Sequence, residues 1–320
     1  MFAKQATEIA NFLAQKNLAK PLIILALSGG PDSVFLFHVL LLLQKLGVAT
    51  FIALHVNHEW RNADAAEEDF CRKLASAHNR PLIVRYAHQT KLKNAGSLEE
   101  YGRRLRLFFL QQAMRQKNAQ LICTAHQQDD LLETFFIRLI RGSSLVGLGS
   151  ILPFNPPFYR PLLAVRKSEI IAHLQKQAIP FCLDETNATD AHLRNRIRNH
   201  LLLELTNIDP RAESKFCSTI NFLQEEAALL DALVLEKFTS LAVQDEAKYF
   251  LDLKQFLQQP PLLQKKLLQQ LLRKNNCKII ESQAVFTEML RFVNNNKSST
   301  HQIANFIVSK KKGRIGIAVV

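Results

Sequence analysis

Short apolar runs alternate with longer helical patterns over residues 22–140, and this alternation constrains the fold more than any other feature of the chain. The strand-like runs cover 22–27, 50–56, 81–86 and 121–124. The helical patterns that follow them cover 31–46, 65–78, 97–117 and 128–140. Strands that alternate with helices form parallel sheets, and an uninterrupted apolar strand such as LIILAL is typical of a sheet covered on both faces. The sequence therefore predicts an α/β fold with a doubly wound parallel sheet.

The pattern changes after residue 205. Helical segments dominate, and they are followed by two short strand-like runs at 302–308 and 314–320. Residues 206–252 carry 4 Lys and Arg against 9 Asp and Glu, whereas residues 253–320 carry 12 against 2. We therefore predict two domains: a sheet-based catalytic domain at 1–205, and a mostly α-helical, partly basic domain at 206–320 with a short β-rich end.

The whole chain is basic, with 41 Lys and Arg against 28 Asp and Glu. This excess of positive charge suits a polyanion such as nucleic acid, although a basic protein without such a partner is the alternative. The five cysteines are scattered and include no C-x-x-C pair, which is typical of reduced thiols in the cytoplasm. The N-terminal pattern is too polar for a secretory signal, and no apolar run reaches membrane-spanning length. We expect a cytoplasmic protein without a membrane partner.

A glycine pair follows the first predicted strand, in the sequence Ser28-Gly29-Gly30-Pro31-Asp32-Ser33. Glycines allow backbone amides to approach phosphate oxygens, and the N-terminus of the following helix favours an anion. Pro31 suits the first turn of that helix, and the two serines add hydroxyl donors. A Walker A loop is excluded because no lysine follows, and G-x-G-x-x-G is absent. The segment predicts a phosphate-binding loop, with a simple tight turn as the alternative.

A second polar cluster, AHQQDDLLET at 125–134, follows the fourth predicted strand. Asp130 and Glu133 are three residues apart on the predicted helix and share a face, and His126 lies in the turn before them. Carboxylates in this position can hold Mg²⁺ or the ammonium groups of a basic substrate. An acidic first turn that only stabilises the helix is the alternative.

The second predicted strand ends in His55-Val56-Asn57-His58, with Arg61 beyond it. Adjacent parallel strands end side by side, so we predict that His58 and Arg61 reach a nucleotide bound at the first loop. A histidine with a structural role is the alternative.

These segments resemble known families. The loop SGGPDS is similar to the pyrophosphate loop of the ATP pyrophosphatase (PP-loop) family, and AHQQDDLLET resembles the A-H-H-x-D-D-x-x-E-T signature of the tRNA(Ile)-lysidine synthetase family. Further stretches that resemble this second family, in order, are RGSSLVGLG at 141–149, RPLL at 160–163, DETN at 184–187 and RNRIR at 194–198. The chain departs from this family's pattern at three places. Gln127 stands where the second histidine is common, Ser144 replaces a usual glycine, and Glu59-Trp60 replaces the usual Gly-Leu.

The resemblance implies a Rossmann-like PP-loop domain and an ATP-dependent ligase. In that family ATP adenylates the C2 oxygen of the wobble cytidine of a tRNA(Ile) with a CAU anticodon, and the ε-amine of L-lysine then attacks C2 and displaces AMP. The implied catalytic residues are His126, Asp130 and Glu133. The implied ATP contacts are Ser28, Gly29, Gly30, Pro31, Asp32, Ser33, His58 and Arg61. The implied Mg²⁺ ligands are Asp32 and Asp130. The implied tRNA contacts are Arg103, Arg104, Arg141, Arg194 and Arg198.

Three other functions fit parts of the pattern: thiolation of a tRNA base, amide ligation of the NAD synthetase kind, and RNA binding without catalysis. Thiolation calls for cysteines placed for sulfur or an iron–sulfur cluster, and no two cysteines are close in sequence.

Arg194, Arg196 and Arg198 are two residues apart, and on a helix this spacing points neighbouring members of the set to different faces. Not all three can therefore contact RNA, and some of them could instead form structural ion pairs. A homo-oligomer stays an open alternative to a monomer.

Overall fold

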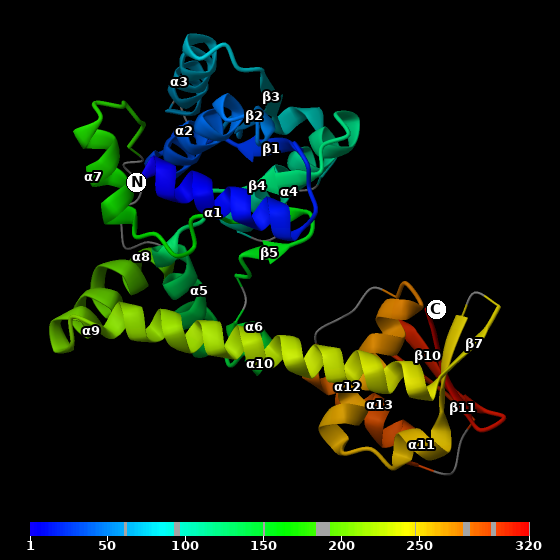
Figure 1. The fold of residues 1–320 in the computed structure, drawn as a ribbon. Coiled ribbons are helices and arrows are strands. Elements are labelled where there is room, and N and C mark those ends of the chain that lie inside the picture. The colour runs from blue at the N-terminus through cyan, green and yellow to red at the C-terminus, as the bar shows by residue number, and fades with distance from the viewer. Residues whose placement is uncertain are drawn as a thin grey trace. The chain divides into compact units, whose positions relative to one another are not determined.

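The computed structural model of the protein describes residues 1–60, 63–92, 97–149, 151–183, 193–246, 248–277, 282–295 and 299–319. The chain forms two compact units, Met1–Gln224 and Glu225–Val320 (Figure 1). Helix α10 (Ala212–Leu241) contributes residues to both units. The predicted domain boundary at 205/206 falls within α9 (Leu203–Ile208), and this functional division stays a prediction.

A six-stranded sheet with the order β3-β2-β1-β4-β6-β5 forms the centre of the first unit. Its strands are β1 (Leu22–Ala26), β2 (Thr50–Asn57), β3 (Leu82–Tyr86), β4 (Leu121–Cys123), β5 (Phe154–Asn155) and β6 (Phe158–Tyr159). All neighbouring pairs are parallel except β5 with β6. The predicted α/β class with a doubly wound parallel sheet is confirmed. The short β5–β6 ribbon lies in a stretch rich in Gly, Ser and Pro that carries no strand pattern.

Helices cover both faces of this sheet because successive strand residues point to opposite sides. On one face, Ile23 and Leu25 pack with α1 (Phe2–Gln15), α2 (Pro31–Lys45), α3 (Ala63–Ala77) and α7 (Lys167–Lys176). On the other face, Ile24 packs with α4 (Leu98–Gln116). Each of these strand side chains is fully buried, and such burial contributes about 1.5–3 kcal/mol per side chain. The two cores fix the strand ends on which the polar segments lie.

A smaller core joins helices that follow the sheet. The elements are α5 (Gln128–Ile140), α6 (Leu145–Leu148), the π-helical turn η3 (Ile197–Leu202), α9 and the first turns of α10. The short helix α8 (Leu193–Arg196) directly precedes η3. Leu132 and Phe136 of α5 pack with Ile197 and Ile220. The arginine-bearing segment RNRIR is thereby held against α5.

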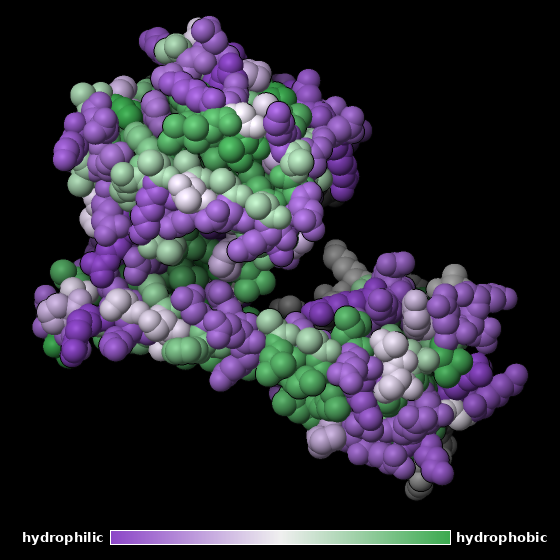
Figure 2. Space-filling view, viewed as in Figure 1, coloured by the Kyte–Doolittle hydropathy of each residue, from purple (hydrophilic) through white to green (hydrophobic). Residues whose placement is uncertain are grey.

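The second unit contains a five-stranded antiparallel sheet with the order β7-β8-β11-β10-β9. Its elements are β7 (Ala242–Asp245), β8 (Lys248–Asp252), α11 (Leu253–Leu257), α12 (Pro261–Lys274), α13 (Gln283–Asn294), β9 (Thr300–Ile303), β10 (Phe306–Lys311) and β11 (Arg314–Val319). Strands β7 and β8 have no counterpart in the sequence-based prediction. In both units hydrophilic side chains form much of the visible surface (Figure 2). Within the described ranges, no helix is long and apolar enough to span a bilayer.

Candidate nucleotide and substrate site

The glycine pair connects β1 to α2, with Gly30 directly before the first helical residue, Pro31. Gly29 has φ +89°, a left-handed conformation that side chains disfavour. A Cβ atom at Gly29 would also lie 3.3 Å from Cys182 Sγ. The loop therefore needs glycine at this position, and it leaves the first amides of α2 without helical partners, as an anion site requires.

The two serines of the loop occupy different environments. Ser28 is exposed, whereas the Ser33 side chain is buried. The Ser33 hydroxyl donates to Gly30 O at 3.0 Å and accepts from Ser28 N at 3.2 Å. Ser33 therefore fixes the shape of the loop from inside. The exposed Ser28 hydroxyl lies 3.2 Å from the Ser33 hydroxyl and 3.4 Å from Gly30 N, on the side of the loop that a ligand can reach.

The second cluster begins at the N-terminus of α5 and is stabilised by a reciprocal cap. Gln127 Oε1 accepts from Asp129 N at 2.6 Å, and Asp130 Oδ2 accepts from Gln127 N at 3.0 Å. Gln127 is fully buried, so the residue that departs from the family signature acts as the cap of this helix.

The N-termini of α2, α5 and α7 lie close together. Gln128 N donates to Val165 O at 2.9 Å, and Lys167 N donates to Asp129 Oδ1 at 3.3 Å, which joins α5 to α7. Burial raises the pKa of Asp32 on α2 to about 7; Lys167 opposes this shift, and Asp130 and Asp129 add to it. The structure thus brings Asp32 and Asp130 together. Lys167 was missed as a site residue because nothing in the sequence signals its proximity to Asp32.

These carboxylates suit a hard divalent cation. Asp32 Oδ1 is buried and lacks a hydrogen-bond partner among the described residues. Mg²⁺ usually binds one or two carboxylates and takes its other oxygens from phosphates and water. In the part of the chain that the structure describes, no group of three or more His, Cys, Asp and Glu side chains could hold a metal ion. Asp32 and Asp130 therefore fit a Mg²⁺ that arrives with a nucleotide.

Glu133 is fully buried between two arginines of the RNRIR segment. Its carboxylate oxygens lie 2.6 Å from Arg198 Nε and 3.2 Å from Arg194 Nε. Burial raises the pKa of Glu133 to about 7, and Arg198 and Arg194 oppose that shift. Arg196 lies between these two arginines in the sequence and is exposed. This agrees with the prediction that the two-residue spacing points the arginines to different faces. This placement suits a residue that orients the two arginines, and direct contact between Glu133 and a substrate stays a prediction.

His126 lies between the acidic cluster and further arginines. Its Nδ1 is 2.9 Å from Thr124 Oγ1. Although the side chain reaches solvent, desolvation by the surrounding protein lowers the pKa of His126 to about 4; Asp130 opposes this shift, and Arg160, Arg106 and Arg194 add to it. The ring is therefore neutral at pH 7 and faces an environment that favours an anion. Arg106 of α4 and Arg160, which follows β6, both belong to this environment.

The other predicted contacts are spread more widely. His58 stacks on Trp60 with ring centroids 4.6 Å apart. Arg103 is exposed on α4, and Arg104 lies 5.8 Å from the centre of the Tyr101 ring. Arg141 is at the far end of α5, roughly 15–20 Å from the capped end at the usual helical rise. Arg61 and the DETN segment at 184–187 lie outside the described residues.

Residues 1–205 match the family model described as the PP-loop domain. The chain is 34% identical over 236 residues to the tRNA(Ile)-lysidine synthase of Geobacter sulfurreducens, which covers 72% of this chain and 50% of that relative. It is 33% identical over 225 residues to the enzyme of the same name from Bacteroides thetaiotaomicron, and this match covers 68% of this chain and 51% of that relative. The chain thus spans about half the length of the curated relatives it matches.

Among solved structures, the U34-tRNA thiolase NcsA from Methanococcus maripaludis, determined with its 4Fe–4S cluster, is similar with a TM-score of 0.60. The sequence identity is 16%, and the match covers 70% of this chain and 79% of that one. At this identity the likeness concerns the fold alone.

Substitution of Asp32 by Asn tests the electrostatics of the converging helices. A carboxyl pKa raised from 3.8 to about 7 makes the folded chain bind a proton more tightly than the unfolded chain does. The free energy of unfolding of the parent protein should therefore fall as the pH rises from about 4 to about 7. In urea titrations without divalent cations, Asp32→Asn should be more stable than the parent by about 1–3 kcal/mol at pH 8 and similar to it near pH 4. Asp69→Asn, at an exposed carboxylate paired with Lys73, is the control; the same pH profile in both variants would contradict the account.

Proposed function

The chain belongs to the PP-loop domain family, and on that premise we propose that it is an ATP-dependent ligase that joins L-lysine to C2 of the wobble cytidine of a tRNA(Ile) with a CAU anticodon. The similarity to curated tRNA(Ile)-lysidine synthases supports the reaction. The structural observation that carries the proposal is the convergence of the glycine loop and the Asp130 cap at one set of helix N-termini.

In the first step the cytidine oxygen attacks the α-phosphate of ATP, and pyrophosphate leaves. The negative charge that develops on the leaving group needs fixed donors that do not have to reorganise. The amides at Gly29 and Gly30, the Ser28 hydroxyl and the N-terminus of α2 supply them, and the Lys167 ammonium adds a positive charge nearby. Bound Mg²⁺, held by Asp32 and Asp130, would neutralise part of the phosphate charge.

In the second step the ε-amine of lysine attacks C2, and AMP leaves. This amine has an ordinary pKa of about 10.4 and must lose a proton before it can attack. A carboxylate close to this amine can hold the ammonium group or accept its proton. We assign this role to Asp130. Glu133 acts mainly through Arg194 and Arg198, which it holds by ion pairs.

The arginines around His126 suit the sugar–phosphate backbone of the target nucleotide. Arg106, Arg160 and Arg194 are close enough to lower the pKa of His126, so their positive charges act on a shared region. A neutral imidazole there can donate or accept a hydrogen bond without adding charge. This arrangement fits an unstacked anticodon base whose backbone is bound beside it.

Thiolation is the nearest alternative, since the structurally similar thiolase carries an iron–sulfur cluster. Such a cluster is usually held by three or four cysteines. Over the residues that the structure covers, no cluster of three candidate metal ligands that includes cysteines is formed. The thiolase also provides only a fold likeness, whereas the lysidine synthases share about a third of the aligned residues. Both observations favour lysine ligation.

Incorporation of labelled lysine into RNA tests the proposed reaction. With Mg-ATP and a tRNA(Ile) transcript carrying a CAU anticodon, we expect ATP-dependent incorporation. Asp130→Asn keeps an oxygen that can cap α5 but removes the charge, and it should lower the rate by about 100-fold or more while the fold is kept. Ser28→Ala should mainly raise the KM for ATP. Asp69→Asn, at an exposed carboxylate of α3, is the matched control, and full activity in Asp130→Asn would contradict the assignment.

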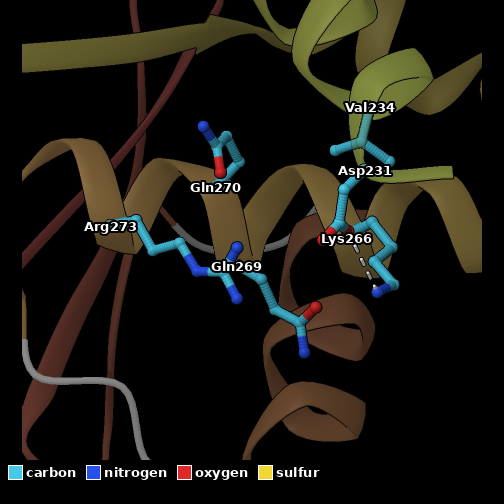
Figure 3. Close-up of a pocket in the computed structure, with 6 residues that line it drawn as sticks. All are labelled: Asp231, Val234, Lys266, Gln269, Gln270 and Arg273. Carbon is cyan, nitrogen blue, oxygen red and sulfur yellow. Dashed lines mark ion pairs between the residues drawn. The ribbon is translucent and has the colours of Figure 1, made fainter. Parts of the chain in front are cut away.

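We further propose that the second unit binds RNA phosphates through α12. Figure 3 shows Lys266, Gln269, Gln270 and Arg273 of this helix lining a small hollow with Asp231 and Val234 of α10. Lys266 Nζ lies 3.7 Å from Asp231 Oδ1, and α12 carries no acidic residue. Two cations and two amide side chains on one helix face suit sequence-independent phosphate contacts.

Arg273→Ala should weaken binding of the tRNA and lower the slope of log affinity against log salt by about 1. Arg291→Ala removes the same charge from α13, where the side chain is exposed and paired with Glu288, and it should have little effect. Filter binding at several salt concentrations measures both variants. Equal losses in the two variants would show that only net charge matters and would rule out this surface.

A further inference from the structure

Two cysteines meet beneath the glycine loop. Cys71 lies on α3 and is fully buried, and Cys182 follows α7 and is partly exposed. A β-carbon at Gly29 would lie 3.3 Å from Cys182 Sγ and 3.5 Å from Cys71 Sγ, so both thiols face the same point of the loop. The sequence gives no sign of this pairing, because many residues and several elements separate the two cysteines.

Each cysteine also contacts the backbone that shapes the loop. Cys182 N donates to Gly29 O at 2.9 Å. Cys71 Sγ lies 3.9 Å from Leu27 O and 3.5 Å from His55 Nδ1, and His55 Nδ1 is itself 3.0 Å from Leu27 O. The two residues therefore contact the chain on both sides of Ser28, Cys71 through its sulfur and Cys182 through its backbone amide. A displacement of either cysteine therefore acts on the backbone that we assign to phosphate binding.

We infer that Cys71 and Cys182 are a thiol modification site that closes to a disulfide and thereby weakens nucleotide binding at the loop. This inference rests on the nucleotide role proposed for the loop. The oxidant is a low-molecular-weight disulfide. The Cys182 thiolate attacks one of its sulfurs and releases one small thiol, and Cys71 then attacks the mixed disulfide and releases the second. Two protein thiols and one small disulfide give one protein disulfide and two small thiols, so electrons and protons balance.

The order of attack follows from exposure. The thiolate is the attacking species, and access to the oxidant is needed first. Burial raises the pKa of both thiols, that of Cys71 to about 12, and only Cys182 is partly exposed. Cys182 therefore reacts with the small disulfide, and Cys71 reacts only within the protein.

The loop responds because it is packed against both sulfurs. A disulfide brings its sulfurs to about 2 Å, well below their contact distance. To reach it, one or both side chains must turn away from Gly29, and α3 and the 181–183 segment must adjust. Gly29 has a left-handed φ of +89°, and its carbonyl is bound by Cys182 N. A shift of this segment alters the direction of the loop amides, and misdirected amides bind phosphate less well.

Equilibrium binding of ATP to the intact chain, without RNA, tests the inference. After treatment with oxidised glutathione, non-reducing peptide mapping should show a Cys71–Cys182 link, and the dissociation constant for Mg-ATP should rise by about tenfold or more. Reduction with dithiothreitol should restore binding. Saturating Mg-ATP should slow formation of the link, because two linked equilibria affect each other equally.

Cys182→Ser and Cys71→Ala should keep their ATP affinity under oxidation, and Cys277→Ser, in the second unit, should respond like the parent. If Cys71→Ala fails to fold, Cys182→Ser alone decides the question. Failure of the link to form, or a link that leaves ATP affinity unchanged, would overturn the inference. A reduced protein that does not bind ATP would also overturn the inference. Loss of lysine incorporation in a protein that still binds ATP would contradict the proposed function but not this site.

Discussion

The meeting of the N-terminal ends of α2, α5 and α7 is the constraint on which the rest of the site depends. The first amides of any helix lack helical partners and attract negative charge. The bonds from Gln128 N to Val165 O and from Lys167 N to Asp129 Oδ1 join the α5 end to the α7 end. Asp32 at the α2 end is close enough for Lys167 and Asp130 to shift its pKa. This arrangement can hold several carboxylates near one another and still leave a favourable place for phosphates.

The carboxylates of the site are balanced in two different ways. Glu133 is fully buried and has two arginines within ion-pair distance. Removal of one partner from such a pair is costly, so the pair fixes the geometry of α8 and η3 relative to α5. Asp32, in contrast, has one buried oxygen without a partner among the described residues, and its pKa is raised to about 7. A carboxylate in this state gains most from a bound cation, which is the behaviour that a metal-assisted phosphate site needs.

The sequence predicts those features that depend on local pattern. The alternation of strands and helices gives the sheet, and the glycine pair and the acidic turn each follow a strand end, so their proximity in a parallel sheet could be anticipated. Features that depend on contacts between distant segments could not. The pairing of Glu133 with Arg194 and Arg198 joins α5 to a segment more than sixty residues later. The approach of Lys167 to Asp32 and the meeting of Cys71 with Cys182 have no local signature either. Strands β7 and β8 were missed because they are short and follow a long helix without a clear change of period.

Identification of the nucleotide product tests the account most directly. The protein is incubated with ATP labelled at the α-phosphate, Mg²⁺, lysine and a tRNA(Ile) transcript with a CAU anticodon, and the labelled product is separated by chromatography. Attack at the α-phosphate predicts AMP, formed in proportion to the lysine incorporated and dependent on the RNA. Labelled ADP as the product would mean that the chain cleaves ATP between the β- and γ-phosphates, and it would contradict the role assigned to the loop.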